Sequence, residues 1–260
     1  MKLIILAAGK GSRLMPLTKN TPKPLMDLGD GVTLLEKQLE SITKSGVIDE
    51  VILVIGYLGH QIESKMSYYQ KQGVKITTVY NPFFEHSNNL ISLWLAKHEM
   101  NDEFMITNGD NIFTPDVFKD LVEKTGEGIH LTILKRDKYG IDDMKVTISD
   151  MNHIVHVSKD IDDENAHGES VGLVKVSGSR YLNAYKNTLE ILARNDEYIN
   201  KFWLETFNAL SGNGVNVTPF EIVGNDKWQE IDIHVDLENF KDLISMGSQA
   251  QFLSKDKKKD

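Results

Sequence analysis

Short apolar runs alternate with segments of helical periodicity along the first half of the chain. Continuous apolar runs predict buried strands at Leu3–Leu6, Val51–Ile55, Val74–Val79 and Glu103–Thr107. Apolar residues at helical spacing predict helices at Thr33–Ser45, Ile62–Gln72 and Asn89–His98. Strands that alternate with helices indicate parallel βαβ units, and uninterrupted apolar strands fit a sheet that is covered on both faces.

The second half has a different pattern, with partly alternating runs that are separated by turn residues. It predicts strands at Ile129–Lys135, Met144–Ile148, Ile154–Val157, Ser170–Val176, Val215–Ile222 and Gln229–Ile233. It predicts helices at Ser179–Ala193, Asn200–Leu210 and Val235–Ile244. We therefore expect a single α/β domain over residues 1–245, a Rossmann-like mixed, mostly parallel sheet flanked by helices. The composition from residue 246 to 260 predicts a mobile tail.

The first strand leads into a loop of small residues, Ala7–Arg13, that contains two cations. Glycine at Gly9 and Gly11 lets backbone N–H groups approach an anion closely. Arg13 can hold a phosphate through its planar fork of donors, and Lys23 adds a compact charge. The loop is neither the G-x-G-x-x-G turn, because Leu14 takes the third glycine position, nor a P-loop, because Ser12 follows Gly11. It fits either an ordinary strand-to-helix turn or a polyphosphate site.

Composition and charge exclude several classes of function. The formal net charge of -9 argues against a nucleic-acid binder, although a few local cations and a metal could still hold an anionic nucleotide. The chain has no cysteine, so it has no disulfide and no thiolate chemistry. The N-terminus begins with a strand rather than a secretory signal, and no apolar run approaches the roughly 20 residues of a membrane helix. We expect a soluble cytoplasmic protein that does not contact a membrane.

Carboxylates follow predicted strands at two distant places. Asp110, in Asn108-Gly109-Asp110-Asn111, is either part of a turn or the first ligand of a Mg²⁺ ion, which prefers carboxylate and phosphate oxygens. Glu230 and Asp232 would share one face of an extended strand. Two adjacent carboxylates repel each other, and a nearby cation would explain why they stand side by side. The alternative is that both lie on a solvated face of the strand.

The segment KLIILAAGKGSRLMPLTKNTPKPL, residues 2–25, resembles the nucleotidyltransferase superfamily that makes NDP-sugars and CDP-alcohols. The signature of that superfamily is LAAGxGxRLxPLTxxxPKPL. The resemblance implies the nucleotide-diphospho-sugar transferase type of fold, with a nucleotide-binding half at residues 1–125 and an acceptor-binding half at 126–245. It implies that Arg13 stabilises the leaving pyrophosphate and that Lys23 holds a phosphate. It implies Mg²⁺ on Asp110 and Asp232, with Glu230 as the next candidate. The nucleotide-binding residues that it implies, besides Asp110, are Leu6, Ala7, Ala8, Gly9, Gly11 and Ser12.

The segment Tyr80–Leu95 narrows the resemblance. Sugar-1-phosphate enzymes usually carry a P-x-G-T-A or P-x-G-L-A segment here, whereas this chain has Asn88-Asn89 and then Ser92-Leu93-Trp94. That pattern is similar to the phosphocholine and related cytidylyltransferases. Further similarity to that group lies in Asp143–Val146, Ser158–Asp160 and Gly168–Gly172. The amides of Asn88 and Asn89 could contact a base or ribose, and Asn88 could equally be a helix N-cap.

The acceptor is less well specified. Lys159 could provide a cation for the acceptor phosphate, and Glu169 and Glu205 could face an acceptor amine or ammonium. Taken singly, each of these residues fits a surface charge better. Four aromatic residues could form a wall for a cationic head group or could simply pack in the core: Tyr57, Trp94, Trp203 and Trp228. The candidate acceptors that the sequence leaves open are phosphocholine, phosphoethanolamine, an aminoalkylphosphonate and phosphoglutamine.

The sequence thus predicts a Mg²⁺-dependent cytidylyltransferase with CTP and a small phosphorylated amine-type acceptor as partners. The product would be a CDP-linked head group for a surface glycan or lipid. The sequence leaves the oligomeric state open, with a homodimer as one alternative. The competing hypotheses are a hexose-1-phosphate thymidylyl- or uridylyltransferase and a non-catalytic nucleotide-sugar-binding regulator. A dinucleotide-dependent oxidoreductase fits the βαβ opening but lacks the third glycine.

Overall fold

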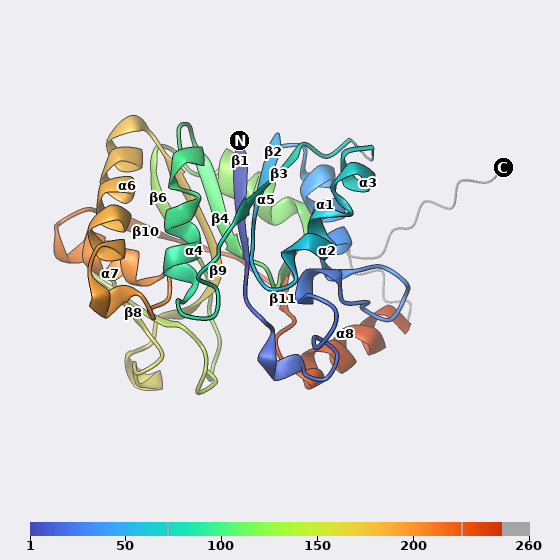
Figure 1. Ribbon diagram of the computed structural model, residues 1–260. Helices are drawn as coiled ribbons and strands as arrows, with labels where there is room; N and C mark the ends of the chain where they lie inside the picture. Colours follow the sequence, from blue (N-terminus) through green and yellow to red (C-terminus); the bar gives the residue numbers. More distant parts are fainter. Residues whose placement is uncertain (72, 225, 246–260) are drawn as a thin grey trace.

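The computed structural model describes residues 1–71, 73–224 and 226–245, without the side chains of 243–245, and its core is one mixed sheet (Figure 1). Within these residues, seven strands form the order β10-β6-β9-β4-β1-β2-β3. Their bounds are β1 Lys2–Ala7, β2 Glu50–Ile55, β3 Ile76–Tyr80, β4 Phe104–Asn108, β6 Gly128–Leu134, β9 Gly168–Ser177 and β10 Val217–Glu221. Strand β9 is antiparallel to β4 and β6, and the other pairs along this path are parallel. The expected α/β fold is therefore confirmed.

One small strand pair extends the sheet, and another forms a ribbon of its own. Strand β7 (Lys145–Ile148) pairs antiparallel with β8 (Ile154–Ser158) and with β9. Strand β5 (Asn111–Phe113) pairs antiparallel with β11 (Trp228–Glu230) as a separate two-stranded ribbon. This ribbon brings residues close to the C-terminus next to the end of β4.

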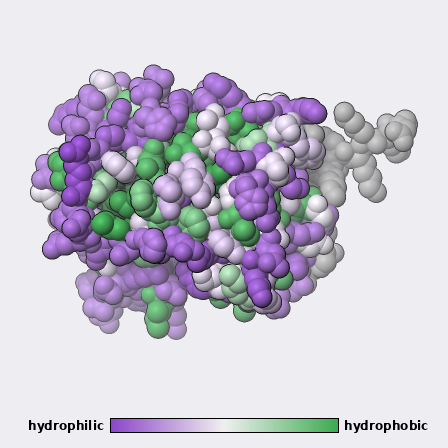
Figure 2. All heavy atoms as spheres, viewed as in Figure 1, coloured by the Kyte–Doolittle hydropathy of each residue, from purple (hydrophilic) through white to green (hydrophobic). Residues whose placement is uncertain are grey.

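Helices cover both faces of the sheet, because side chains of a strand point alternately to its two sides. Ile4 and Leu6 pack in a core with α4 (Asn89–Leu95), α6 (Ser179–Ala193) and α7 (Glu205–Gly212). Leu3 and Ile5 pack on the opposite face with α1 (Leu34–Ser45), α2 (Gly59–Glu63), α3 (Met66–Lys71) and α5 (Pro115–Glu123). A third, small core joins Leu14 to α8 (His234–Ser245). Hydrophilic residues cover most of the face in Figure 2, with apolar groups between them.

Several predicted elements differ from the structure. The helix predicted at 62–72 is two short helices, because α2 ends in a turn in which the Ser64 N–H donates to the His60 carbonyl and the Lys65 N–H to the Ile62 carbonyl. The helix predicted at 89–98 is α-helical only to Leu95, and a 3₁₀ turn follows at Lys97–Glu99. The helix predicted at 200–210 starts at Glu205. The strand predicted at 229–233 stops at Glu230, because Ile231 turns into the third core.

The strands β1 and β4 place their carboxyl ends side by side, at the edge where open α/β sheets bind ligands. Gly109 follows β4, and a Cβ there would lie 2.8 Å from the Leu6 carbonyl oxygen. This close approach lets the chain turn directly from β4 into Asp110. None of the described helices is long and apolar enough to cross a membrane. The tail predicted at 246–260 lies outside the described residues.

Candidate active site

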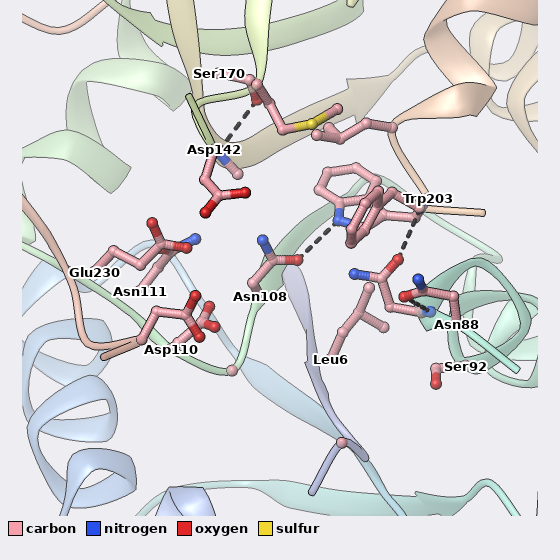
Figure 3. Close-up of a pocket in the computed structure, with 18 of the residues that line it drawn as sticks. Leu6, Asn88, Ser92, Asn108, Asp110, Asn111, Asp142, Ser170, Trp203 and Glu230 are labelled. Carbon is pink, nitrogen blue, oxygen red and sulfur yellow. Dashed lines mark hydrogen bonds between the residues drawn. The ribbon is translucent and has the colours of Figure 1, made fainter. Parts of the chain in front are cut away.

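A cavity of about 510 Å³ opens at the carboxyl ends of β1 and β4 (Figure 3). Both halves of the chain contribute to its wall. The residues predicted from the sequence that line it are Leu6, Ala8, Gly9, Gly11, Ser12, Arg13, Lys23, Asn88, Asn89, Asp110, Lys159, Glu169, Trp203, Glu230 and Asp232. The fold therefore collects at one place residues that are more than 200 positions apart in the sequence.

The glycine loop sets the positions of the two cations. Gly11 has a positive φ of 62°, and a Cβ at this position would lie 3.1 Å from Thr18 Cγ2 and 3.3 Å from Lys23 Cβ. Thr18 Oγ1 donates to the Gly11 carbonyl at 2.8 Å, which closes the loop. The loop leaves the Arg13 side chain 55% exposed and buries Lys23 to 8% exposure. One cation therefore faces the open cavity, and the other lies at its base.

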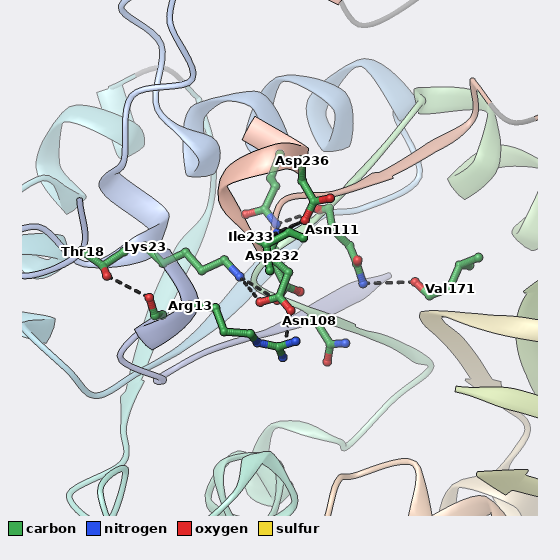
Figure 4. A network of polar contacts seen from close by, with 12 residues as sticks. Arg13, Thr18, Lys23, Asn108, Asn111, Val171, Asp232, Ile233 and Asp236 are labelled. Atoms are coloured by element: carbon green, nitrogen blue, oxygen red, sulfur yellow. Dashed lines mark hydrogen bonds and ion pairs between the residues drawn. The ribbon is translucent and has the colours of Figure 1, made fainter. Parts of the chain in front are cut away.

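Lys23 joins two carboxylates, one from the middle of the chain and one from near its C-terminal end; Figure 4 shows its contact with Asp232. Its Nζ lies 2.9 Å from Asp110 Oδ2 and 3.1 Å from Asp232 Oδ1. Arg13 Nη2 lies 2.8 Å from the second oxygen of Asp232. Burial acts to lower the pKa of Lys23, but the charges and hydrogen bonds of Asp110 and Asp232 outweigh it and raise the pKa. Lys23 is therefore a permanent ammonium.

Backbone contacts hold the two carboxylates in register. The Ile231 N–H donates to the Asp110 carbonyl at 3.0 Å. The Asp232 N–H donates to Asp236 Oδ2 at 2.9 Å, at the start of α8. The β5–β11 ribbon places Glu230 opposite Asn111. The turn after β4 and the end of β11 therefore form one unit.

The carboxylates offer oxygens to a cation but do not form a complete metal site. Asp110 Oδ1 is buried and has no hydrogen-bond donor among the described residues. Loss of hydration in the cavity, and then the charges of Asp110 and Asp232, raise the pKa of Glu230 to about 8. The described residues contain no group of three or more His, Cys, Asp or Glu side chains placed to hold a metal ion. Asp110, Asp232 and Glu230 together are therefore no protein-only metal site.

Asn88 and Asn89 line the cavity, and their side-chain oxygens have structural partners. Asn88 Oδ1 accepts from the Asn89 N–H at 2.7 Å as the N-cap of α4. Asn89 Oδ1 accepts from the Trp203 N–H at 2.8 Å. The N-cap alternative therefore holds for Asn88, and a contact of either amide with a base stays a prediction.

Residues 126–245 contribute a second group of charges, which the sequence indicated only in part. Glu169 is 3% exposed, and its Oε1 lies 2.8 Å from Arg136 Nε. Burial, followed by a hydrogen bond with Asp143, raises the pKa of Glu169 to about 8. Burial acts in the same direction on Asp143, but the hydrogen bonds from Glu169 and from the Gly140 N–H hold the pKa of Asp143 below its ordinary value. The opposite pKa shifts of these two carboxyl groups favour a protonated Glu169 beside a charged Asp143.

Sequence reasoning did not single out several residues of the wall. Lys159 Nζ lies 2.9 Å from Asp142 Oδ1, and Arg13 Nη1 lies 3.9 Å from the other oxygen of Asp142. Asn108 Oδ1 accepts from the indole N–H of Trp203 at 2.8 Å. Asp143 belongs to a motif that the resemblance noted, and Asn108 belongs to the tetrapeptide around Asp110. These motifs were the available signal, but they do not show which side chains face the cavity.

Three predicted site residues do not line the cavity. Ala7 is buried against Gly109. Tyr57 donates its hydroxyl to the Lys19 carbonyl at 2.7 Å. Glu205 accepts from Asn208 Nδ2 at 2.9 Å within α7. Trp94, from the predicted aromatic wall, also lies outside, because its indole N–H donates to Glu190 at 2.7 Å. The predicted contacts of Tyr57 and Glu205 with an acceptor therefore have no geometric support.

Comparisons with known proteins found similarity over much of the chain. The family model "Nucleotidyl transferase" matches residues 2–138. Choline-phosphate cytidylyltransferase of Streptococcus pneumoniae is 37% identical over 126 residues, 48% of this chain and 52% of that protein. CTP:phosphoglutamine cytidylyltransferase of Campylobacter jejuni is 27% identical, over 92% of this chain and 98% of that protein. The chain spans about half the length of the choline-phosphate relatives that it matches.

Solved structures show the same fold. A CTP:phosphocholine cytidylyltransferase from Streptococcus pneumoniae superposes with a TM-score of 0.72 at 24% identity, covering 93% of this chain and 98% of that one. An inositol-1-phosphate CTP transferase from T. maritima superposes with a TM-score of 0.76 at 23% identity, covering 95% and 96% of the two chains.

Proposed function

Because this chain belongs to the nucleotidyl transferase family, we propose that it is a cytidylyltransferase that transfers CMP from CTP to a small phosphorylated amine-type acceptor. Lys23 between Asp110 and Asp232, with Arg13 beside them, is the observation that carries this proposal. It combines cations for a triphosphate with oxygens for a metal in one cavity. The cytidylyltransferases among the relatives support the choice of CTP and of this acceptor class.

The proposed reaction joins two phosphorus groups. An ionised oxygen of the acceptor phosphate attacks the α-phosphorus of CTP, the bond from that phosphorus to the β-phosphate oxygen breaks, and pyrophosphate leaves. The attacking oxygen already carries a negative charge, so no general base is required. Such chemistry depends on positioning and on neutralisation of charge.

The two cations have different tasks in this scheme. Arg13 reaches from the loop toward the open cavity, where its fork of donors suits the leaving pyrophosphate. Lys23 is buried and rigidly held, so it suits the phosphate at which the new bond forms. Backbone N–H groups at Gly9 and Gly11 would face the triphosphate, as in other glycine-lined anion sites.

A divalent metal ion fits the carboxylate oxygens. Asp110 Oδ1 is buried and has no hydrogen-bond donor in the described part of the chain. Asp232, like Asp110, lies against the ammonium group of Lys23. Mg²⁺ needs only one or two carboxylates when phosphate oxygens and water complete its shell. Asp110 and Asp232 would hold it, and when bound it would neutralise charge on the triphosphate. The product would be a CDP-linked head group, of use to surface-glycan or lipid synthesis.

The test is a screen of pyrophosphate release over four nucleoside triphosphates and a panel of acceptors. We expect turnover with CTP and Mg²⁺ and an amine-bearing phosphate, phosphonate or phosphoglutamine. Turnover only with a sugar 1-phosphate and UTP or dTTP would refute the proposal. Nucleotide binding without turnover of any acceptor would favour the competing hypothesis, a non-catalytic nucleotide-sugar-binding regulator.

A variant pair tests the metal carboxylate. Asp110→Asn keeps the size of the side chain but removes the charge, and we expect its turnover to fall at least about 100-fold with the fold intact. Asp150→Asn is the matched control, because Asp150 is exposed in a turn away from the cavity. Equal activity of Asp110→Asn and the unmodified protein would contradict the assignment.

A further inference from the structure

We propose that the acceptor carries a primary ammonium group, with N–H donors, rather than a quaternary ammonium. The inference rests on the proposed function and specifies its acceptor as a phosphate or phosphonate of a short primary amine. The aromatic rings of the cavity and the carboxyl groups beside them carry the argument.

Cations of the protein already lie over two of the four aromatic rings that line the cavity, those of Trp228 and Phe202. The guanidinium carbon of Arg136 lies 5.8 Å from the centre of the Trp228 ring. Lys159 Nζ lies 5.5 Å from the centre of the Phe202 ring. Quaternary ammonium groups are bound by exposed aromatic faces, and a second cation at an occupied face is repelled by the first. These two rings therefore offer little to a trimethylammonium group.

Both covering cations are held in place. Arg136 Nε lies 2.8 Å from Glu169 Oε1, and Lys159 Nζ lies 2.9 Å from Asp142 Oδ1. Trp203 also lines the cavity, but its side chain is completely buried. Displacing Arg136 would remove the cation that lies against the Glu169–Asp143 pair, in which Asp143 keeps its charge.

The same part of the wall is rich in groups that accept hydrogen bonds. Glu169 and Asp143 form a hydrogen-bonded pair, and Glu230 lies near Glu169. Asp143 and Glu230 also line the cavity. Carboxylate oxygens accept N–H groups, and a primary ammonium has three to donate. A trimethylammonium has none, so it would desolvate these oxygens without pairing them.

One member of this group keeps its charge. The pKa of Asp143 is lowered, so Asp143 is the carboxylate with which an ammonium would pair. Glu230 lies beside the Asp110–Asp232 pair, so the ammonium and the reacting phosphate would lie within one short molecule.

A graded series of acceptors tests the proposal. Phosphoethanolamine, its N-methyl and N,N-dimethyl derivatives and phosphocholine lose one N–H at each step and share the same phosphate ester. We expect kcat/KM with CTP to fall stepwise, at least about 10-fold over the series, mostly through KM. Aminoethylphosphonate, measured beside phosphoethanolamine, distinguishes a phosphonate from a phosphate ester.

Two variants test the residues. Glu169→Gln keeps the size of the side chain, and we expect it to raise KM for phosphoethanolamine about 10-fold and to leave KM for CTP unchanged. Arg136→Gln uncovers the Trp228 ring, and we expect it to narrow the gap between phosphoethanolamine and phosphocholine, which a purely structural role would not do. Glu164→Gln is the control, because Glu164 is exposed and outside the cavity.

Calorimetric binding of the four esters, with a non-hydrolysable CTP analogue present, gives the same order without turnover. A flat order of affinities, an absence of binding, or a preference for phosphocholine would overturn the inference. The expected order of affinities without any pyrophosphate release would instead count against the proposed function alone.

Discussion

Lys23 lies between the two carboxylates that we propose as ligands of a metal ion. In Lys23→Met the two acids lose their ammonium and repel each other, so we expect a lower melting temperature in metal-free buffer. We expect Mg²⁺ to raise the melting temperature of this variant more than that of the unmodified protein, and turnover to fall at least about 100-fold. Differential scanning fluorimetry with and without Mg²⁺ measures the first effect.

Lys119→Met is the matched control, because Lys119 is exposed on α5. It should change neither the melting temperature nor its dependence on Mg²⁺ by a comparable amount. An unchanged response of Lys23→Met to Mg²⁺ would contradict the placement of the metal on Asp110 and Asp232.

The raised pKa of Glu169 predicts that the stability of the protein depends on pH. Its pKa rises from 4.5 to about 8 on folding, so between these values the native state holds a proton that the unfolded state has lost. The contribution of Glu169 to the free energy of unfolding therefore falls as pH rises from about 4.5 to 8, by at most about 1.4 kcal/mol per pH unit. Above pH 8 this contribution no longer changes with pH. Urea unfolding at pH 5 to 9 measures this slope.

Glu169→Gln should remove part of that slope and leave the rest, because the pKa of Glu230 is also raised to about 8 and acts in the same direction. Asp143 titrates below this window, since its pKa is lowered. A slope that is identical in Glu169→Gln would show that Glu169 is ionised throughout.

Single residues could be predicted from the sequence where a motif fixes them. Arg13, Lys23, Asp110 and Asp232 came from such motifs, and all four line the cavity. Tyr57 was chosen by its residue type and its place after a strand, but its hydroxyl turns to the Lys19 carbonyl. The direction of a side chain depends on neighbours that are remote in sequence, so residue type alone could not reveal it.

At the scale of elements, α1 supports the ribbon that carries the site. Gln38 Nε2 donates to the Asn111 carbonyl at 2.8 Å, and Ser41 Oγ donates to the Phe113 carbonyl. The helix begins with a capping box, in which Thr33 Oγ1 accepts from the Glu36 N–H at 3.3 Å and Glu36 Oε2 accepts from the Thr33 N–H at 2.7 Å. The start of α1 therefore affects β5 and the turn that precedes it.

We expect Thr33→Ala to lower the free energy of unfolding by about 1 kcal/mol, because it removes the N-cap oxygen. Chemical denaturation measures this loss, and kcat should change little. Thr43→Ala is the matched control: Thr43 is exposed inside the same helix, where alanine is the better helix former. Equal losses in the two variants would show that the cap contributes nothing specific.

Elements with a continuous apolar pattern could be predicted, and elements made by tertiary contacts could not. The strands around β1, β2, β4 and β9 were predicted near their observed bounds. The sequence prediction omitted α5, although Pro115 at its start and Val117, Phe118 and Leu121 on one face form a helical pattern. The ribbon β5–β11 has strands of three residues, and only their pairing across the fold defines them.

The whole molecule depends on a contact between the two ends of the chain. Residues 228–232 return to the turn after β4, so that Lys23 and Asp232 meet across 209 positions. The resemblance to a known family predicted this meeting, whereas periodicity alone could not, because apolar patterns say nothing about which distant segments pair. The cavity therefore exists only while the second half stays docked on the first.

That dependence predicts how ligand binding and unfolding are coupled. The protein should unfold in one step, and CTP with Mg²⁺ should move the whole transition upward, by about 2.7 kcal/mol at a free ligand concentration 100 times Kd. Calorimetry on the full chain measures both. UTP and dTTP at the same concentration should give smaller shifts, and Asp110→Asn should reduce the shift by CTP. Two transitions, of which CTP moves only one, would mean that the halves fold separately. The nucleotide would then bind one half alone, and Asp232 would have no part in holding it.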